Sequence, residues 1–178
     1  MKIPDEYACG SKPLDDKREE LAFALFNFNV QVAIDTVEEK GFIEMLKLTK
    51  VDDKEKNRMK LELIMFNLFT TSKWIMNNYK ENGAELLDRL HFHFKKAFSD
   101  NDWVFGEVVA ERHITYNNAL ANNAGAGPMF WLGREATLHI LGKDEKNVDS
   151  GVLIAASLTF AGNFSSVAKG INTMVKGY

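Results

Sequence analysis

The sequence predicts a single all-α domain, because apolar residues recur at helical spacing along most of its 178 residues. The clearest case is residues 59–79, which carry few charges and place apolar side chains on two sides of a helix. Such a helix must be covered on both sides, so we expect it at the centre, packed by the first and last helices, with Glu62 and Lys73 facing water. No linker divides the chain, and we expect an irregular segment at residues 1–13 and one compact domain of about six helices at residues 14–178.

The first predicted helix begins near Asp16, where Asp16 and Glu19 have the spacing of a capping box. Its continuation, from Phe26 to Ile34, alternates apolar and mostly polar residues as a strand does, yet it also carries two apolar stripes at helical spacing. We favour a helix because no other segment repeats the alternation and could pair with it. The alternative is an α+β fold with a strand at residues 26–34. Gly41 is expected to kink or end this element.

Apolar stripes and turn residues predict three more helices between the central helix and the last one. Asn82 and Gly83 interrupt the chain ahead of the first of them, and Pro128, which suits a first helical turn, opens the third. The predicted ranges are residues 84–98, 103–121 and 128–141. A flexible Gly-rich stretch separates the second of these helices from the third.

The last predicted helix, capped by Asp149 or Ser150 and running towards Met174, sorts its side chains by size. Large apolar residues such as Phe160 and Ile171 lie on one side. The opposite side is formed by small residues, called here the small-residue ridge: Gly151, Ala155, Thr159, Gly162 and Ser166. We expect the ridge to pack closely against another helix of the core. The alternative is a groove that admits a ligand or a partner helix.

Composition excludes several classes of function. With 22 basic and 25 acidic residues and no basic face or tail, the chain is not expected to bind nucleic acid. A membrane span is not expected either, because residues 152–168 are short for a bilayer and carry Asn163 and four hydroxyl groups that would need partners in lipid. The lone Cys9 cannot form an intramolecular disulfide, and the N-terminus has no apolar run that would serve as a signal peptide. We therefore expect a cytoplasmic protein.

Four residues on neighbouring predicted helices are the candidates for a metal or acid–base site: Glu107, Glu111, Glu135 and His139. Each pair is one helical turn apart, so antiparallel packing of the two helices could bring three carboxylates and one imidazole together. No Glu-x-x-His pair of the kind used by di-iron bundles occurs, however. The alternative is a solvated acidic face with a Glu135 to His139 pair along one helix. No motif in the chain predicts a catalytic residue or a cofactor.

Three functions fit these observations. The first is a soluble helical interaction or adaptor domain that associates with itself, since the chain has more large apolar residues than one core stripe per helix can use. The second is a binding module for an apolar small molecule, held between the small-residue ridge and aromatic side chains; its candidate residues are Phe66, Trp74, Trp131 and Gly162. The third is a metal-dependent or acid–base enzyme built on the four residues above.

Overall fold

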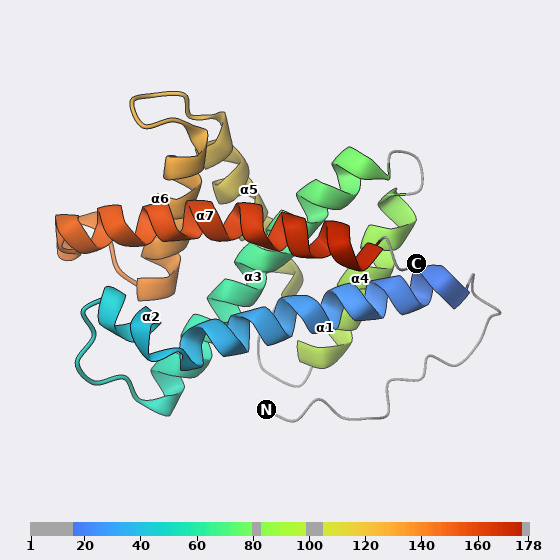
Figure 1. Ribbon diagram of the computed structural model, residues 1–178, viewed down its shortest axis with the longest axis horizontal. Coiled ribbons are helices and arrows are strands. Elements are labelled where there is room, and N and C mark those ends of the chain that lie inside the picture. Colours follow the sequence, from blue (N-terminus) through green and yellow to red (C-terminus); the bar gives the residue numbers. More distant parts are fainter. Residues whose placement is uncertain (1–15, 80–82, 99–104, 176–178) are drawn as a thin grey trace.

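The computed structural model describes residues 16–79, 83–98 and 105–175, and these confirm the all-α prediction (Figure 1). Helices account for 87% of the residues described, and no strand occurs among them. The irregular segment predicted at residues 1–13, with Cys9, lies outside the described residues. The elements are α1 (Asp16–Glu38), α2 (Lys40–Met45), α3 (Asp53–Asn78), α4 (Gly83–Phe98), α5 (Phe105–Ala121), α6 (Pro128–Leu141), the 3-10 helix η2 (Glu145–Asn147) and α7 (Ser150–Val175).

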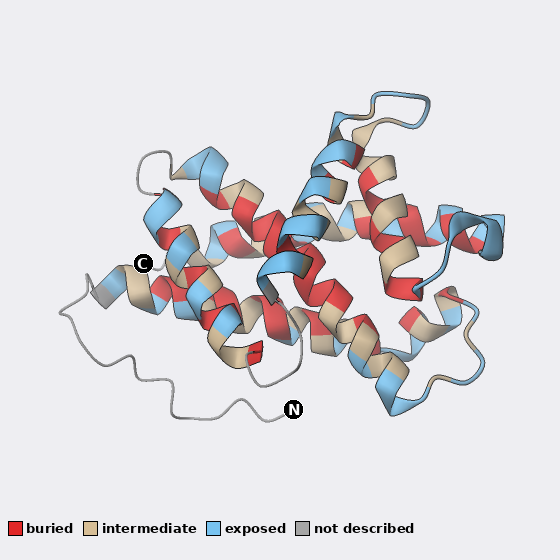
Figure 2. Cartoon of the chain, turned by 180° about the vertical axis from the view of Figure 1, so that it is seen from behind, coloured by how far each residue is buried: buried red, intermediate tan, exposed pale blue. Residues whose placement is uncertain are grey.

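Helix α3 is the centre of the domain, as the sequence predicts. It packs against α1, α4, α5, α6 and α7, and every residue from Glu62 to Ser72 is buried (Figure 2). The expectation that Glu62 faces water is therefore wrong. The helix begins at Asp53, earlier than predicted, because the Asp52 carboxylate accepts a hydrogen bond from the Glu55 backbone N–H at 2.7 Å and caps it.

The stretch from Phe26 to Ile34 lies within α1, so the α+β alternative is wrong. Its strand-like alternation arises partly from Asn29, which is fully buried against α3. The Asn29 amide nitrogen donates to the Leu25 carbonyl at 2.6 Å, and its amide oxygen accepts from the Thr71 hydroxyl at 2.9 Å. A polar residue thus occupies a core position because its hydrogen bonds are made inside the protein. Helix α1 ends before Glu39, and Gly41 lies inside the next helix, α2.

Helices α6 and α7 cross at very close range through a glycine. A Cβ atom at Gly133 would lie 2.0 Å from the carbonyl oxygen of Ser157 and 3.1 Å from the backbone nitrogen of Ala161. The sequence places the close contact of α7 on the small-residue ridge, and this is wrong: all five ridge residues are exposed. The close approach uses Gly133 of α6 instead, and the inward side of α7 carries large residues such as Phe160 and Ile171.

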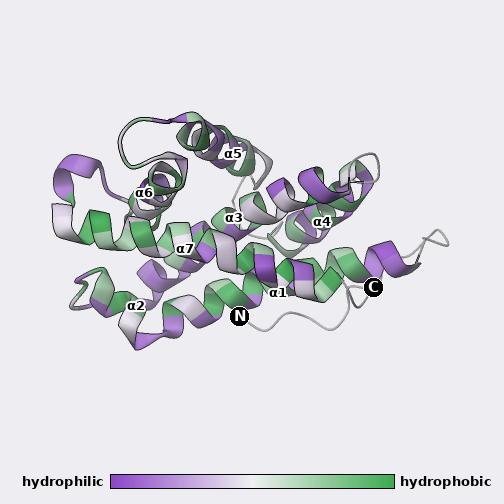
Figure 3. Cartoon of the chain, turned by 45° about the horizontal axis from the view of Figure 1, so that its top comes forward, coloured by the Kyte–Doolittle hydropathy of each residue, from purple (hydrophilic) through white to green (hydrophobic). Residues whose placement is uncertain are grey.

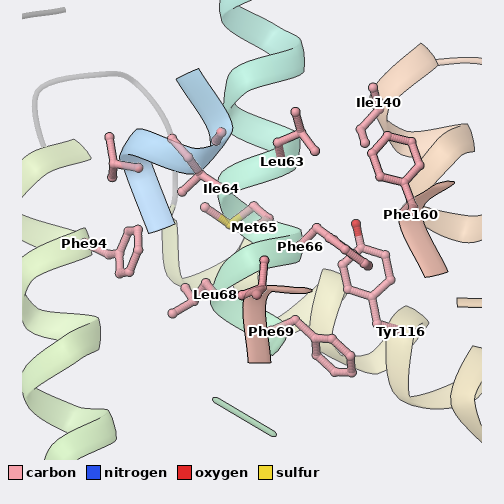
Figure 4. Close-up of a cluster of buried hydrophobic side chains, with 14 of the residues drawn as sticks. Leu63, Ile64, Met65, Phe66, Leu68, Phe69, Phe94, Tyr116, Ile140 and Phe160 are labelled. Atoms are coloured by element: carbon pink, nitrogen blue, oxygen red, sulfur yellow. The ribbon is translucent and has the colours of Figure 1, made fainter. Parts of the chain in front are cut away.

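Aromatic side chains fill the space between α3 and the helices that cover it (Figure 4). Phe66 meets Tyr116 of α5 edge to face, with ring centroids 5.6 Å apart, and meets Phe160 of α7 at 6.1 Å. Phe69 contacts the same tyrosine at 5.2 Å. These contacts hold both α5 and α7 against the central helix and place Tyr116 close to the cleft described next.

Candidate functional site

A cleft of about 480 Å³ lies where α3, α5 and α6 meet, and it gathers ionisable side chains from all three helices. We call it the polar cleft. Its lining is Arg58 and Glu62 from α3, Arg112 from α5, Glu135, Leu138 and His139 from α6, and Gly142, Lys143, Asp144 and Glu145 from the segment that follows α6. Two of the four residues that the sequence singles out for metal or acid–base chemistry, Glu135 and His139, thus line one cleft.

The Glu62–Arg112 ion pair forms part of the cleft wall. Arg112 donates from Nε to Oε2 of Glu62 at 2.8 Å and from Nη2 to Oε1 at 2.7 Å, a two-point contact between α3 and α5. Only 11% of the Glu62 side chain and 13% of the Arg112 side chain are exposed. The hydrogen bonds to Glu62 hold the pKa of Arg112 above its usual value despite burial. The guanidinium is therefore charged and its position fixed.

His139 and Tyr116 contact each other beside this pair, with ring centroids 5.9 Å apart. Among the described residues, neither Nε2 of His139 nor the hydroxyl of Tyr116 has a hydrogen-bond partner, although both atoms are buried. Burial, followed by the charge of Arg112, lowers the pKa of His139, and burial raises the pKa of Tyr116. At neutral pH the site therefore holds a neutral imidazole next to a neutral phenol, and each offers a buried polar atom without a partner among the described residues.

Two of the four candidate metal residues, Glu111 and Glu135, form ion pairs with arginines. Oε1 of Glu135 accepts from Arg134 at 2.5 Å, and Oε1 of Glu111 accepts from Arg112 at 2.9 Å. Glu107 is exposed and does not line the cleft. Within the described part of the chain, no group of three or more His, Cys, Asp or Glu side chains is placed to hold a metal ion. The carboxylates can lie near one another because guanidinium groups supply the positive charge.

Arg58 closes one end of the cleft. Its two terminal nitrogens donate to the carbonyl oxygens of His139 at 3.0 Å and Ile140 at 2.8 Å, so it caps the last turn of α6. The chain leaves that turn through Gly142, whose φ of 60° brings the backbone against the guanidinium. Arg58 therefore fixes the backbone that carries His139.

The four residues predicted to bind an apolar ligand do not converge. Phe66 lines a cavity between α1, α3 and α7. The indole of Trp74 donates to the side-chain oxygen of Asn172 at 3.0 Å, and that of Trp131 donates to the Ala124 carbonyl at 2.7 Å. Gly162 faces open space, with no atom near the position of a Cβ. Of these four residues, only Phe66 lines that cavity.

Residues 150–168 of α7 are uncharged, and Figure 3 colours much of this helix hydrophobic or neutral. We define the α7 outer face as Ile154, Leu158 and the small-residue ridge. Ile154 is 52% exposed and Leu158 is 59% exposed. No Asp, Glu, Lys or Arg occurs at residues 150–168. By length and composition, α7 is the one helix in the described residues that could cross a membrane. In its apolar 18-residue stretch, 33% is buried inside the protein.

No protein-family model matches this chain, and no curated protein or solved structure matches it either. A proposal about function therefore rests on the polar cleft, the cavity beside Phe66 and the α7 outer face.

Proposed function

We propose that the protein is a helical interaction module that associates with a second copy of itself through the α7 outer face. The observation that carries the proposal is the exposure of Ile154 and Leu158 on α7. This helix is long and apolar, as a buried core helix is, yet these two side chains face outward. Apolar side chains that lie together on the surface and carry no charge among them are typical of a protein interface.

The spacing of the small-residue ridge supports a helix as the occupant. Ridge residues recur every three or four positions over about 22 Å of helix, which allows two backbones to approach closely while larger side chains pack alongside. Leu158 and Ile154 lie along one border of the ridge. A two-fold axis would place the ridge of one copy against the same residues of the other.

The absence of charge favours a second copy over a charged partner. Residues 150–168 offer no ion pair to an acidic or basic protein, whereas an identical face matches them in polarity. A lipid surface is the competing occupant. The free-energy cost of placing α7 in contact with lipid is lower than the sequence suggests. The hydroxyls of Ser157, Thr159 and Ser166 already donate hydrogen bonds to carbonyls of their own helix.

Sedimentation velocity at tens of micromolar tests the proposal with two matched variants. Leu158→Glu places a charge on the α7 outer face, and Ile114→Glu places one at an exposed apolar site on α5, where the side chain is 63% exposed. We expect the wild type and Ile114→Glu to be dimers and Leu158→Glu to be a monomer. A monomeric wild type that floats with neutral lipid vesicles would assign the face to a membrane surface instead.

A second candidate function is the binding of a small polar molecule at the polar cleft, favoured by the convergence of Glu62, Arg112, Glu135 and His139 from three helices. Lys143 and Asp144 also line the cleft, and neither side chain forms an ion pair with any residue that the structure describes. Opposite charges side by side suit a ligand that carries both a carboxylate and an amino group. His139, whose Nε2 has no partner among the described residues, would form a hydrogen bond to the ligand.

Amide chemical shifts recorded during titration with free amino acids at millimolar concentration test this candidate. We expect shifts confined to residues that line the polar cleft, and their loss in Lys143→Ala. Divalent metal ions serve as the comparison, and we expect them to leave the melting temperature unchanged because Arg112 and Arg134 already neutralise the carboxylates. Absence of shifts with every amino acid would remove the candidate, and stabilisation by a metal would favour the metal site predicted from sequence.

A further inference from the structure

A cavity of about 150 Å³ lies between α1, α3 and α7. Five of its nine lining residues are apolar: Phe28 and Val32 of α1, Leu63 and Phe66 of α3, and Val167 of α7. We call it the apolar cavity. Figure 1 shows α1 and α7 lying across α3.

The remaining lining residues are polar: Thr36, Asn67, Asn163 and Ser166. The Thr36 hydroxyl donates to the Val32 carbonyl at 2.7 Å, and the Ser166 hydroxyl donates to the Gly162 carbonyl at 3.2 Å, so both oxygens can only accept a further bond. Asn163 differs from them. Among the described residues its side chain forms no hydrogen bond, so its amide can both donate and accept.

The size and chemistry of the wall favour an organic molecule over water. The volume equals that of several water molecules, but water needs two to four polar partners, and five of the nine lining residues are apolar and offer none. An apolar cavity of about 150 Å³ is large enough to hold a benzene ring. Phe28 and Phe66 present aromatic surfaces from two helices, which favours a flat ring over an alkyl chain.

We propose that the apolar cavity binds a single-ring aromatic alcohol, with the ring between Phe28 and Phe66 and the hydroxyl at the side chain of Asn163. A single six-membered aromatic ring fits a cavity of about 150 Å³. A phenolic hydroxyl donates one hydrogen bond and accepts others, and the Asn163 amide is complementary to both roles. This ligand site shares no residue with the polar cleft, and it shares only Ser166 with the α7 outer face.

Phenol and benzene are the probes, titrated into the full-length protein while amide chemical shifts and the melting temperature are followed. We expect saturable binding of both, an increase in melting temperature, and tighter binding of phenol. In Val167→Phe the introduced ring occupies the cavity, so both probes should fail to bind. Wild-type protein that binds neither probe saturably, or folded Val167→Phe protein that binds both as well as the wild type does, would overturn the proposal.

Asn163→Leu tests the hydrogen bond and keeps the proposal testable if Val167→Phe does not fold. This variant should weaken phenol binding about 2- to 10-fold, the effect of one lost hydrogen bond, and leave benzene binding unchanged. Asn118→Leu on α5, at an exposed asparagine outside the cavity lining, is the matched control and should bind both probes as the wild type does. Equal phenol affinity in Asn163→Leu and Asn118→Leu would also overturn the proposal.

Discussion

Glu62 of α3 and Arg112 of α5 meet through two hydrogen bonds of 2.7 and 2.8 Å in the interior of the domain. The two residues lie 50 positions apart in the sequence. Their pairing fixes the helix that carries Tyr116 against the central helix, and Arg112 in turn acts on the protonation of His139. The relationship makes α3 part of the polar cleft as well as the centre of the core.

Removing one partner of this pair should cost more than removing both. Glu62→Leu leaves a buried guanidinium with only the exposed Glu111 as partner, and we expect it to lower the free energy of unfolding by about 3–5 kcal/mol. Arg112→Leu should be similarly destabilising. Because two leucines would pack without uncompensated charge, the double variant should lie closer to the wild type than either single variant. Urea denaturation measures all three, and additive costs would contradict the prediction.

Alanine at Gly133 and at Gly162 should act in opposite directions. A Cβ at Gly133 would lie 2.0 Å from the Ser157 carbonyl oxygen, so α6 and α7 must separate, at a cost of about 1–3 kcal/mol or more. At Gly162 the space is open, and alanine should stabilise the helix by about 0.5–1 kcal/mol. Thermal unfolding at a concentration where the protein is monomeric isolates the two effects. Similar stability of the two variants would show that the α6–α7 crossing is not tight.

Loss of Arg58 should loosen the end of α6. Arg58→Ala removes two hydrogen bonds to the carbonyls of His139 and Ile140, and we expect about 1–3 kcal/mol of destabilisation. A lysine keeps the charge but lacks the planar fork that reaches both carbonyls, so Arg58→Lys should be intermediate. Hydrogen exchange should accelerate first in the amides of the last turn of α6. Uniform acceleration over the whole chain would contradict a local role for Arg58.

Acid should destabilise the protein through its histidines. Burial lowers the pKa of all four below the usual 6.5, and that of His113 to about 4. The native state then binds fewer protons than the unfolded state, so this stability is fully present above about pH 6.5 and declines as the pH falls. His113 alone should account for a loss of about 2 kcal/mol by about pH 5.

Urea midpoints at neutral and mildly acidic pH, compared between the wild type and His113→Gln, measure this contribution. The variant removes one titrating group, so its stability should depend less steeply on pH. An NMR titration in which His113 changes charge near its ordinary pKa would contradict the burial argument.

Sequence reasoning succeeds here where a segment's own period decides its structure. The helix that opens with Pro128 has the predicted bounds, because a proline at the first turn and Gly142 after the last are local signals. It fails where the partner lies far along the chain. Burial of Glu62 depends on Arg112, and burial of Asn29 depends on Thr71. Neither pairing can be read from the spacing of apolar residues along the sequence.

One signal for the charged cluster was present in the sequence. Each of two candidate carboxylates has an arginine as its immediate neighbour, Arg112 after Glu111 and Arg134 before Glu135. In the structure these neighbours form the ion pairs. Whether an acidic side chain on a helix meets a metal or a guanidinium therefore depends on the adjacent residues as much as on the spacing of the acids.

The tight crossing at Gly133 holds α7 by its inner side, so the two sides of this helix can change independently during evolution. Substitutions at inward positions such as Phe160 would be removed by selection on folding, whereas those at Leu158 would be sampled freely until they altered a contact with another molecule. A mutant library could be sorted once for abundance and once for assembly, and each sorted pool sequenced. Positions sensitive in each sort should recur at helical spacing, on the inward side of α7 for abundance and on the outward side for assembly. The second set of positions would identify the residues that other molecules touch.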